Sequence, residues 1–252
     1  MNIVVCCKVV PDDQDIQVAA DGTLDYSKAK PIVSAYDLNA IEAAAQLAAA
    51  NEGSNVVAVT VGGADIDDSK LKKNVLARGV DELVMIADDA CADLDAHATA
   101  AMLARLVDGL DAADLIVCGD GSADNYAQQV DVQLAARLGV PSVNGVTKIT
   151  PEGGSLLVER TLESVVETVR VPLPAVVSVS PDVAVPRIPG MKDILAAGKK
   201  PMDVRAAAGA YAGSVEAVST LAPEQADRKL EILDASADGA VEQFAAAIRA
   251  AL

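Results

Sequence analysis

Residues 114–139 read DLIVCGDGSADNYAQQVDVQLAARLG, and this stretch decides the fold. It opens with an apolar run at 115–118, which is typical of a strand buried on both faces of a parallel sheet. A turn begins at Gly119, and a helix is then predicted by apolar residues at every fourth position, namely Val130, Leu134 and Leu138. Gly139 ends that helix. The stretch therefore predicts a strand, a turn and a helix of an α/β protein.

The turn suits a phosphate, because a glycine-containing turn before a helix presents backbone N–H groups at the positive end of the helix dipole. It matches neither the GxGxxG dinucleotide motif nor a Walker loop. A strand–turn–helix unit without any ligand fits the same residue types equally well.

The composition limits the class of protein. Of the 252 residues 52% are hydrophobic and only 2% aromatic, so aliphatic side chains must form the core. The formal net charge of −17 disfavours nucleic acid and anionic membranes, and it favours basic partners. No stretch reaches the roughly 18 apolar residues of a membrane span, so no stable membrane insertion is expected. The N-terminus has no basic signal region, which predicts a cytoplasmic protein.

The cysteines and the histidine do not form a metal-binding pattern. Cys6 and Cys7 are adjacent, Cys91 and Cys118 stand alone, and no CxxC pair occurs. They are predicted to be small buried residues in a reducing compartment. We expect His97 on a helix surface, and we expect neither a metal site nor a histidine-dependent triad.

Strands and helices alternate through the first half of the chain. Strands are predicted at 3–7, 55–61, 83–86 and 115–118, and helices are predicted to start at Asp37, at Asp67 or Asp68, and at Asp95. This alternation predicts an α/β fold, a mostly parallel twisted sheet with helices on both faces. Ligands of such a sheet bind at the carboxyl ends of its strands.

The pattern changes after Pro141. An antiparallel hairpin is predicted near 155–171, followed by a core strand at 175–179. From Pro181 onward the core signal is weak, and an amphipathic helix is predicted at 238–252. This extended C-terminal arm is either a poorly ordered tail or a clasp around a partner subunit. We favour the clasp, because the arm is too apolar for a solvated tail.

Four stretches resemble the β subunit of electron transfer flavoproteins, and the likeness runs over nearly the whole chain. They are IVVCCKVVPD at 3–12, SAYDLNAIEAA at 34–44, CGDGSADNYAQQV at 118–130 with LGVPSVNGVTKI at 138–149, and VERTLESVVETVRVPLPAVVSVS at 158–180. The fourth stretch, which continues into IPGMK at 188–192, is the most specific. The loop at 118–130 is most similar to the branch associated with nitrogen fixation and anaerobic carnitine metabolism.

The resemblance implies an adenine nucleotide alpha-hydrolase-like fold and an electron carrier without bond chemistry of its own. It implies a heterodimer with an α subunit, a redox-active FAD shared with that subunit, and either AMP or a second FAD in the β domain. Electrons would pass between an acyl-CoA dehydrogenase-type flavoprotein and a second redox partner. Residues 1–185 would form the nucleotide-binding domain, and 186–252 would hold a docking loop and the arm that wraps the α subunit.

The resemblance also implies site residues. Ile188, Pro189 and Met191 would dock into the dehydrogenase, and Tyr36 would lie against the flavin. A Tyr36 that is merely buried, and an Ile188 that packs under the arm, are the alternatives. The implied cofactor-binding set follows strand ends and helix starts: Cys6, Cys7, Ser34, Ala35, Tyr36, Asp37, Val61, Gly119, Ser122, Ala123, Asp124, Asn125, Tyr126, Ala127, Gln128, Gln129 and Val130.

One departure concerns the second nucleotide. Many family members have Asp-Gly-Asp or Asp-Asp-Asp before the helix, where this chain has Ala123, Asp124 and Asn125. The pocket could therefore hold AMP, hold FAD or stay empty, and the bulk of Tyr126 favours AMP over FAD.

Two rival functions share parts of the pattern. An adenine-nucleotide-binding α/β hydrolase or universal-stress-like ATP-binding protein would explain the sheet and the loop, but it would not explain 158–192 or the arm. A flavin-free scaffold that binds partners through the arm is the third hypothesis.

Overall fold

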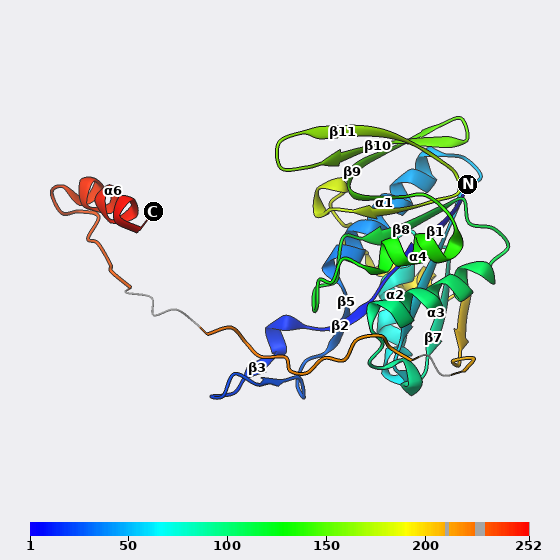
Figure 1. The fold of residues 1–252 in the computed structure, drawn as a ribbon, viewed down its shortest axis with the longest axis horizontal. Helices are drawn as coiled ribbons and strands as arrows, with labels where there is room; N and C mark the ends of the chain where they lie inside the picture. Colours follow the sequence, from blue (N-terminus) through cyan, green and yellow to red (C-terminus); the bar gives the residue numbers. More distant parts are fainter. Residues whose placement is uncertain (210–211, 225–229, 252) are drawn as a thin grey trace. The chain divides into compact units, whose positions relative to one another are not determined.

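The computed structural model describes residues 1–209, 212–224 and 230–251. These residues form two compact units, one of Met1–Gln17 with Asp25–Ser219 and one of Val18–Leu24 with Thr220–Leu252. The centre of the first unit is a nine-stranded sheet with the order β11-β10-β9-β12-β8-β1-β6-β7-β13 (Figure 1). The predicted α/β fold class is confirmed.

Six strands form the parallel part of this sheet, and five of them come from the apolar runs seen in the sequence. The six strands are β1 (Asn2–Cys6), β6 (Asn55–Gly62), β7 (Glu82–Ala87), β8 (Leu115–Gly119), β12 (Ala175–Val179) and β13 (Met202–Arg205). Val5 of β1 pairs with Ala58 on one side and with Val117 on the other. The edge strand β13 was not predicted, because it is short and half polar and has no apolar run.

The other end of the sheet is antiparallel. It consists of β9 (Ser142–Glu152), β10 (Ser155–Thr161) and β11 (Val166–Pro172). The predicted hairpin of β10 and β11 is confirmed, and β9 joins it to the parallel strands by pairing parallel with β12 and antiparallel with β10.

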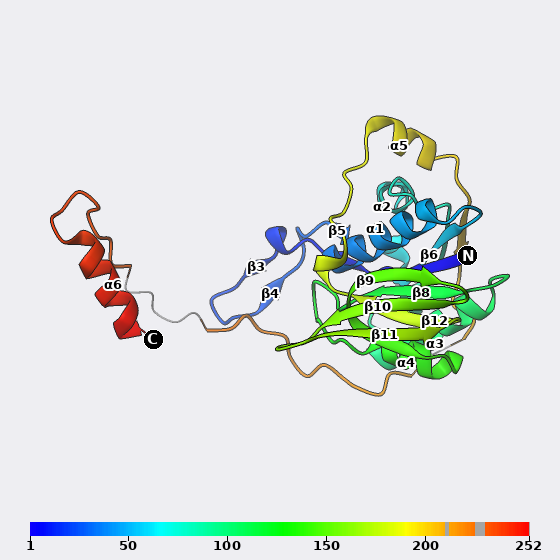
Figure 2. The same ribbon diagram turned by 90° about the horizontal axis from the view of Figure 1, so that it is seen from above.

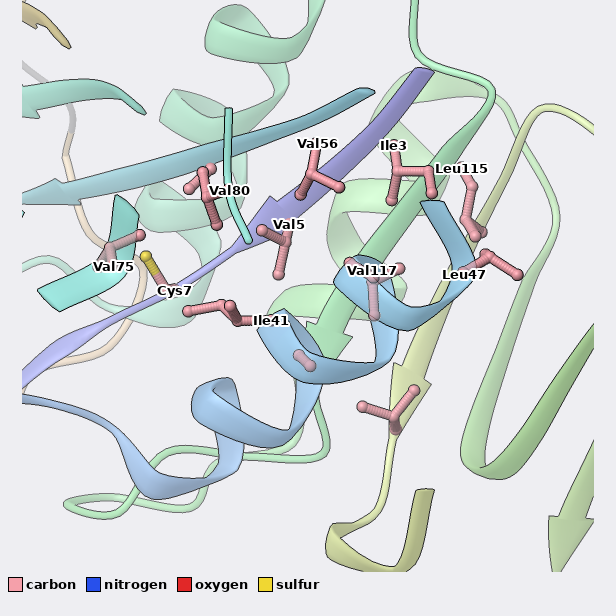
Figure 3. Close-up of a cluster of buried hydrophobic side chains, with 14 of the residues drawn as sticks. Ile3, Val5, Cys7, Ile41, Leu47, Val56, Val75, Val80, Leu115 and Val117 are labelled. Carbon is pink, nitrogen blue, oxygen red and sulfur yellow. The ribbon is translucent and has the colours of Figure 1, made fainter. Parts of the chain in front are cut away.

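Helices cover both faces of the sheet, as predicted. On one face α1 (Ala35–Ala50) and α2 (Ser69–Leu76) pack on a core cluster that includes Ile3, Val5 and Val117 (Figure 3). On the other face α3 (Ala96–Asp108) and α4 (Val130–Leu138) pack on a cluster that includes Val4 and Cys6. Successive residues of β1 therefore point into opposite cores, which is why the strand is apolar throughout.

Helix ends follow the predicted signals in most places. Asp68 and Asp95 accept hydrogen bonds from N–H groups in the first turns of α2 and α3. Gly139 ends α4 in the left-handed conformation, with φ 68°. The predicted start of α1 at Asp37 is wrong, because Ser34 is the N-cap residue and Asp37 lies inside the first turn.

Shorter elements complete the described chain. Two small sheets pair β2 (Val9–Pro11) with β5 (Pro31–Val33), and β3 (Gln17–Val18) with β4 (Leu24–Asp25). A short helix, α5 (Met191–Ala197), precedes β13. The second unit contains α6 (Ala240–Ala251), which matches the predicted amphipathic helix except that Leu252 lies outside the described residues. Its apolar residues Val241, Phe244 and Ile248 are exposed.

Three further expectations concern the cysteines, the histidine and membranes. All four cysteines are buried free thiols, and His97 is an exposed residue of α3, as predicted. Among the described residues, no helix has the length and apolar character needed to cross a membrane.

Candidate functional site

The order of the strands places a candidate site at the ends of β1 and β8. The chain leaves β1 toward β6 and β7, and then returns to form β8 on the other side of β1. Adjacent strands that connect in opposite directions leave a crevice outside their carboxyl ends, where open α/β sheets bind ligands. Cys6 and Gly119 are the last residues of these two strands.

A buried carboxylate in the first turn of α1 ties the two strand ends together. The Asp37 side chain accepts a hydrogen bond from the Lys8 backbone N–H, with N to Oδ2 at 2.7 Å, and another from the Gly119 backbone. Burial raises the pKa of Asp37 to about 7, although both N–H donors oppose this shift. The start of α1 is thereby fixed against β1 and β8.

The loop after β8 closes onto the same helix start. Ser34 Oγ accepts a hydrogen bond from the Ala123 backbone N–H at 3.2 Å. Lys8 Nζ forms an ion pair with Asp124 Oδ2 at 2.5 Å. Lys8 was not among the predicted site residues, although its position directly after a predicted strand could have indicated it.

Two tyrosines from distant parts of the sequence meet at this loop. The ring centroids of Tyr36 and Tyr126 are 5.0 Å apart. The Tyr126 hydroxyl donates to Asp120 Oδ2 at 2.8 Å, and this hydrogen bond is the main cause that raises the pKa of Tyr126 to about 12. A Cβ at Gly121 would collide with the Tyr126 ring, so a side chain larger than glycine does not fit there.

The backbone of the loop is held in an unfavourable conformation. Tyr126 and Gln128 have positive φ angles of 44° and 53°, which residues with a Cβ seldom adopt. The Gln128 side chain is fixed by its hydrogen bond to Asp120 Oδ1 at 3.1 Å. Strain of this kind is concentrated at functional sites, because surrounding contacts must maintain it.

Hydrogen-bond donors for an anion are present on two helices. Within the described residues, neither α1 nor α4 receives a hydrogen bond from the side chain of its N-cap residue, Ser34 or Gln129. Their first-turn N–H groups carry the positive end of the helix dipole. Backbone donors at helix starts are the kind of group that binds phosphate, and the polar residues Ser122 and Asn125 belong to the adjoining loop.

The structure gathers most of the predicted cofactor-binding residues, but not all in the same way. Direct contacts join Ser34 to Ala123 and Asp37 to Gly119, and Lys8 holds Asp124 by an ion pair. Cys6 and Cys7 are buried at the end of β1, and the Cys7 N–H donates to Val59 within the sheet. Among the described contacts none joins Val61 to the loop; it packs with the α3–α4 core. The sequence prediction omitted Lys8, Asp120 and Gly121.

The predicted docking residues extend from a firmly held segment. Ile188 is 93% exposed and Met191 79% exposed. Just before them, Arg187 makes a bidentate contact with buried Glu42 of α1, with Nε to Oε2 at 2.6 Å and Nη2 to Oε1 at 3.0 Å. Asn39, one helical turn earlier, donates to the Ala184 carbonyl at 2.8 Å. We call this set of contacts from Asn39 and Glu42 the α1 clamp.

We predict that Glu42→Gln lowers the free energy of unfolding by about 1–2 kcal/mol, because it leaves one guanidinium without its carboxylate partner. The loss is smaller than for a fully buried pair, since solvent reaches the Arg187 side chain. Urea unfolding measures it, and Glu152→Gln in the exposed Arg170–Glu152 pair is the control, with a change below about 0.5 kcal/mol. Equal losses in the two variants would contradict the α1 clamp.

Comparison with known families adds one finding. The family model of the electron transfer flavoprotein domain matches residues 21–210, which is most of the chain. The chain belongs to the electron transfer flavoprotein family. Proteins of this family bind flavin and are electron carriers rather than enzymes. The predicted resemblance is therefore confirmed at the level of the family, while the subunit and the branch stay predictions.

Proposed function

We propose that this chain is the β subunit of a heterodimeric electron transfer flavoprotein that works only together with its α subunit. It would carry electrons between an acyl-CoA dehydrogenase-type flavoprotein and a second redox partner in the cytoplasm. The observation that supports this most strongly is the position of the loop 120–129. This loop is closed onto the start of α1, at the point where the strand order of the sheet reverses, in a chain of a flavoprotein family. The likeness of the loop at 118–130 to the branch associated with nitrogen fixation and anaerobic carnitine metabolism supports the assignment of the chain to that branch.

The closed loop supports a nucleotide held in the β domain. The uncapped starts of α1 and α4 would bind its phosphate, and Ser122, Asn125 and Gln129 would contact its polar groups. We propose AMP rather than a second FAD, because the Tyr126 ring packs over Gly121 and against Tyr36. With their rings in contact and tilted by 46°, the two tyrosines leave less room for a flavin in this loop.

Tyr36 is proposed to contact the redox-active FAD that the α subunit shares with this chain. Its ring is half-buried and is positioned by Tyr126, so an aromatic face is already fixed at the edge of the site. Bound flavin supplies the electron-accepting chemistry. The residues of this chain would position the flavin. The hydrogen bonds of buried Asp37 hold the ends of β1 and β8 at a fixed distance from the start of α1.

The remaining regions fit partner binding. Ile188, Pro189 and Met191 are proposed to dock into the dehydrogenase, and 186–252 to provide the docking loop and the arm around the α subunit. The exposed apolar face of α6 supports the arm, since such a face needs a partner surface. The rival adenine-nucleotide hydrolase would leave that face and the docking segment without a role.

The test is to purify the chain with its α subunit, denature the complex and identify the released nucleotides by mass. We predict one FAD and one AMP per heterodimer. Two FAD would contradict the assignment of AMP to the loop, and no flavin would contradict the proposed function. A flavin-free complex is also the result that the scaffold hypothesis expects. ATP turnover by the chain alone would favour the rival hydrolase.

A further inference from the structure

Basic residues are concentrated in two stretches of this acidic chain. Residues 69–80 and 187–200 together contain eight basic residues and one acidic residue, a formal charge of +7. The rest of the chain then has 12 basic and 36 acidic residues, a formal charge of −24. Asp67 and Glu42, which lie outside these stretches, pair with Lys72 and Arg187, and including them reduces the formal charge from +7 to +5. An excess of basic residues on one surface favours acidic partners there.

The two stretches lie side by side in the fold. Helix α2 packs against α5, and Figure 2 shows α5 on the same side of the sheet as α2 and α1. Lys200 Nζ donates to the Leu76 carbonyl at 3.0 Å and to the Val80 carbonyl, so it caps the C-terminal end of α2. We call the surface formed by 69–80 and 187–200 the α2–α5 surface.

Several of its lysines are available to a partner. Lys70, Lys192 and Lys199 are exposed. Within the part of the chain that the structure describes, none of these three has a carboxylate within ion-pair distance. By contrast, Lys72 pairs with Asp67 and Arg187 with Glu42, so those charges serve the fold.

Apolar side chains project beside these lysines. They are Val185, Ile188, Met191 and Leu195, with exposed fractions of 86%, 93%, 79% and 68%. The α1 clamp fixes the start of this segment, and Arg78 donates a further hydrogen bond to the Arg187 carbonyl. A fixed apolar projection costs less ordering entropy on binding than a flexible one.

We propose that the α2–α5 surface steers an acidic protein onto this apolar projection, with Lys70 of α2 and Lys192 of α5 as the steering charges. The proposal rests on the proposed function, and it adds the chemistry of the partner: an apolar recess bordered by carboxylates. A protein fits better than a polyanion, because the formal charge of −24 elsewhere in the chain repels anionic membranes and nucleic acid. The exposed apolar side chains also have no counterpart on a phosphate backbone.

The test uses the flavin-loaded heterodimer with Lys70→Glu and Lys192→Glu, and a purified acyl-CoA dehydrogenase as the probe. We expect the second-order rate constant of flavin reduction to fall about tenfold at low salt, while the rate at saturating dehydrogenase stays unchanged. The wild-type rate constant should decrease as salt rises, and the variant should lose this dependence. The matched control is Lys28→Glu with Lys30→Glu, two exposed lysines outside the surface, with a change below about twofold.

Direct binding of the dehydrogenase to the oxidised heterodimer separates this proposal from the proposed function. If the dehydrogenase binds in a lysine-dependent and salt-sensitive way but transfers no electrons, the proposed electron-carrier function is refuted, while steering by the α2–α5 surface is supported. Absence of dehydrogenase binding, or equal rate constants and salt dependence in variant and wild type, would overturn the steering surface. Lysine-dependent binding to duplex DNA or to phosphatidylserine vesicles instead of the dehydrogenase would also overturn it.

Discussion

Gly119→Ala is expected to lower the free energy of unfolding by about 2–3 kcal/mol and to release the nucleotide of the β domain. A Cβ at this position would lie 2.5 Å from Asp37 Oδ1 and 3.0 Å from the backbone carbon of Tyr36. Neither neighbour is the free end of a flexible side chain, because Asp37 is held by two backbone N–H groups. The new methyl group must therefore push the end of β8 away from the start of α1.

Gly198→Ala is the matched control. Its Cβ would lie 3.4 Å from Lys73 Cε, an atom of a flexible side chain, and its backbone is helical. We expect a change below about 0.5 kcal/mol in urea unfolding and no loss of nucleotide. Unchanged stability and nucleotide content in Gly119→Ala would show that the contact between β8 and α1 is not as close as described.

Asp37 is expected to make stability depend on pH in the opposite sense to most carboxylates. Its folded pKa is raised from 3.8 to about 7, because burial disfavours the charge. Between these values the folded state keeps a proton that the unfolded state has lost, so this contribution is complete at low pH and disappears as pH rises toward 7. The loss amounts to about 4 kcal/mol over this range.

The measurement is urea unfolding of wild type and Asp37→Asn from about pH 4.5 to pH 8. The stability of wild type minus that of the variant should decrease steadily as pH rises to about 7. Asp68→Asn is the control. Hydrogen bonds from the Leu71 and Lys70 N–H groups lower the pKa of Asp68, so this carboxylate is ionised in both states throughout the range. A flat difference for Asp37→Asn would contradict a protonated buried carboxyl.

The sequence predicted the sheet because its strands are apolar on both faces and its helices have recognisable ends. The structure follows the local signals that were carried by residues 115–118, Asp68, Asp95 and Gly139. β13 was missed because it is a short strand at the edge of the sheet, and α5 because it is a short helix whose buried residue is Ala197. Edge elements depend on pairing with residues far away in sequence, and pattern analysis of one segment does not detect that pairing.

The misplaced start of α1 has a similar cause. Asp37 is a residue type that commonly caps helices, but its carboxylate bonds to Lys8 and Gly119, which no local pattern could indicate. Ser34 is the N-cap residue, and its hydroxyl is used by Ala123. The site is thus made of contacts between segments far apart in sequence. The residues that the resemblance implies include Ser34, Asp37 and Gly119, whereas Lys8 and Asp120, which the structure joins to them and to the loop, were not among them.

We propose that this chain, with its α subunit, holds a flavin that accepts electrons from one flavoprotein and passes them on. The most direct measurement mixes the purified heterodimer, without oxygen, with a substrate-reduced acyl-CoA dehydrogenase and follows the flavin absorbance of the heterodimer. We expect bleaching of this absorbance, followed by its return when a second electron acceptor is added. A yellow heterodimer whose flavin stays oxidised, or a heterodimer that contains no flavin, would contradict it.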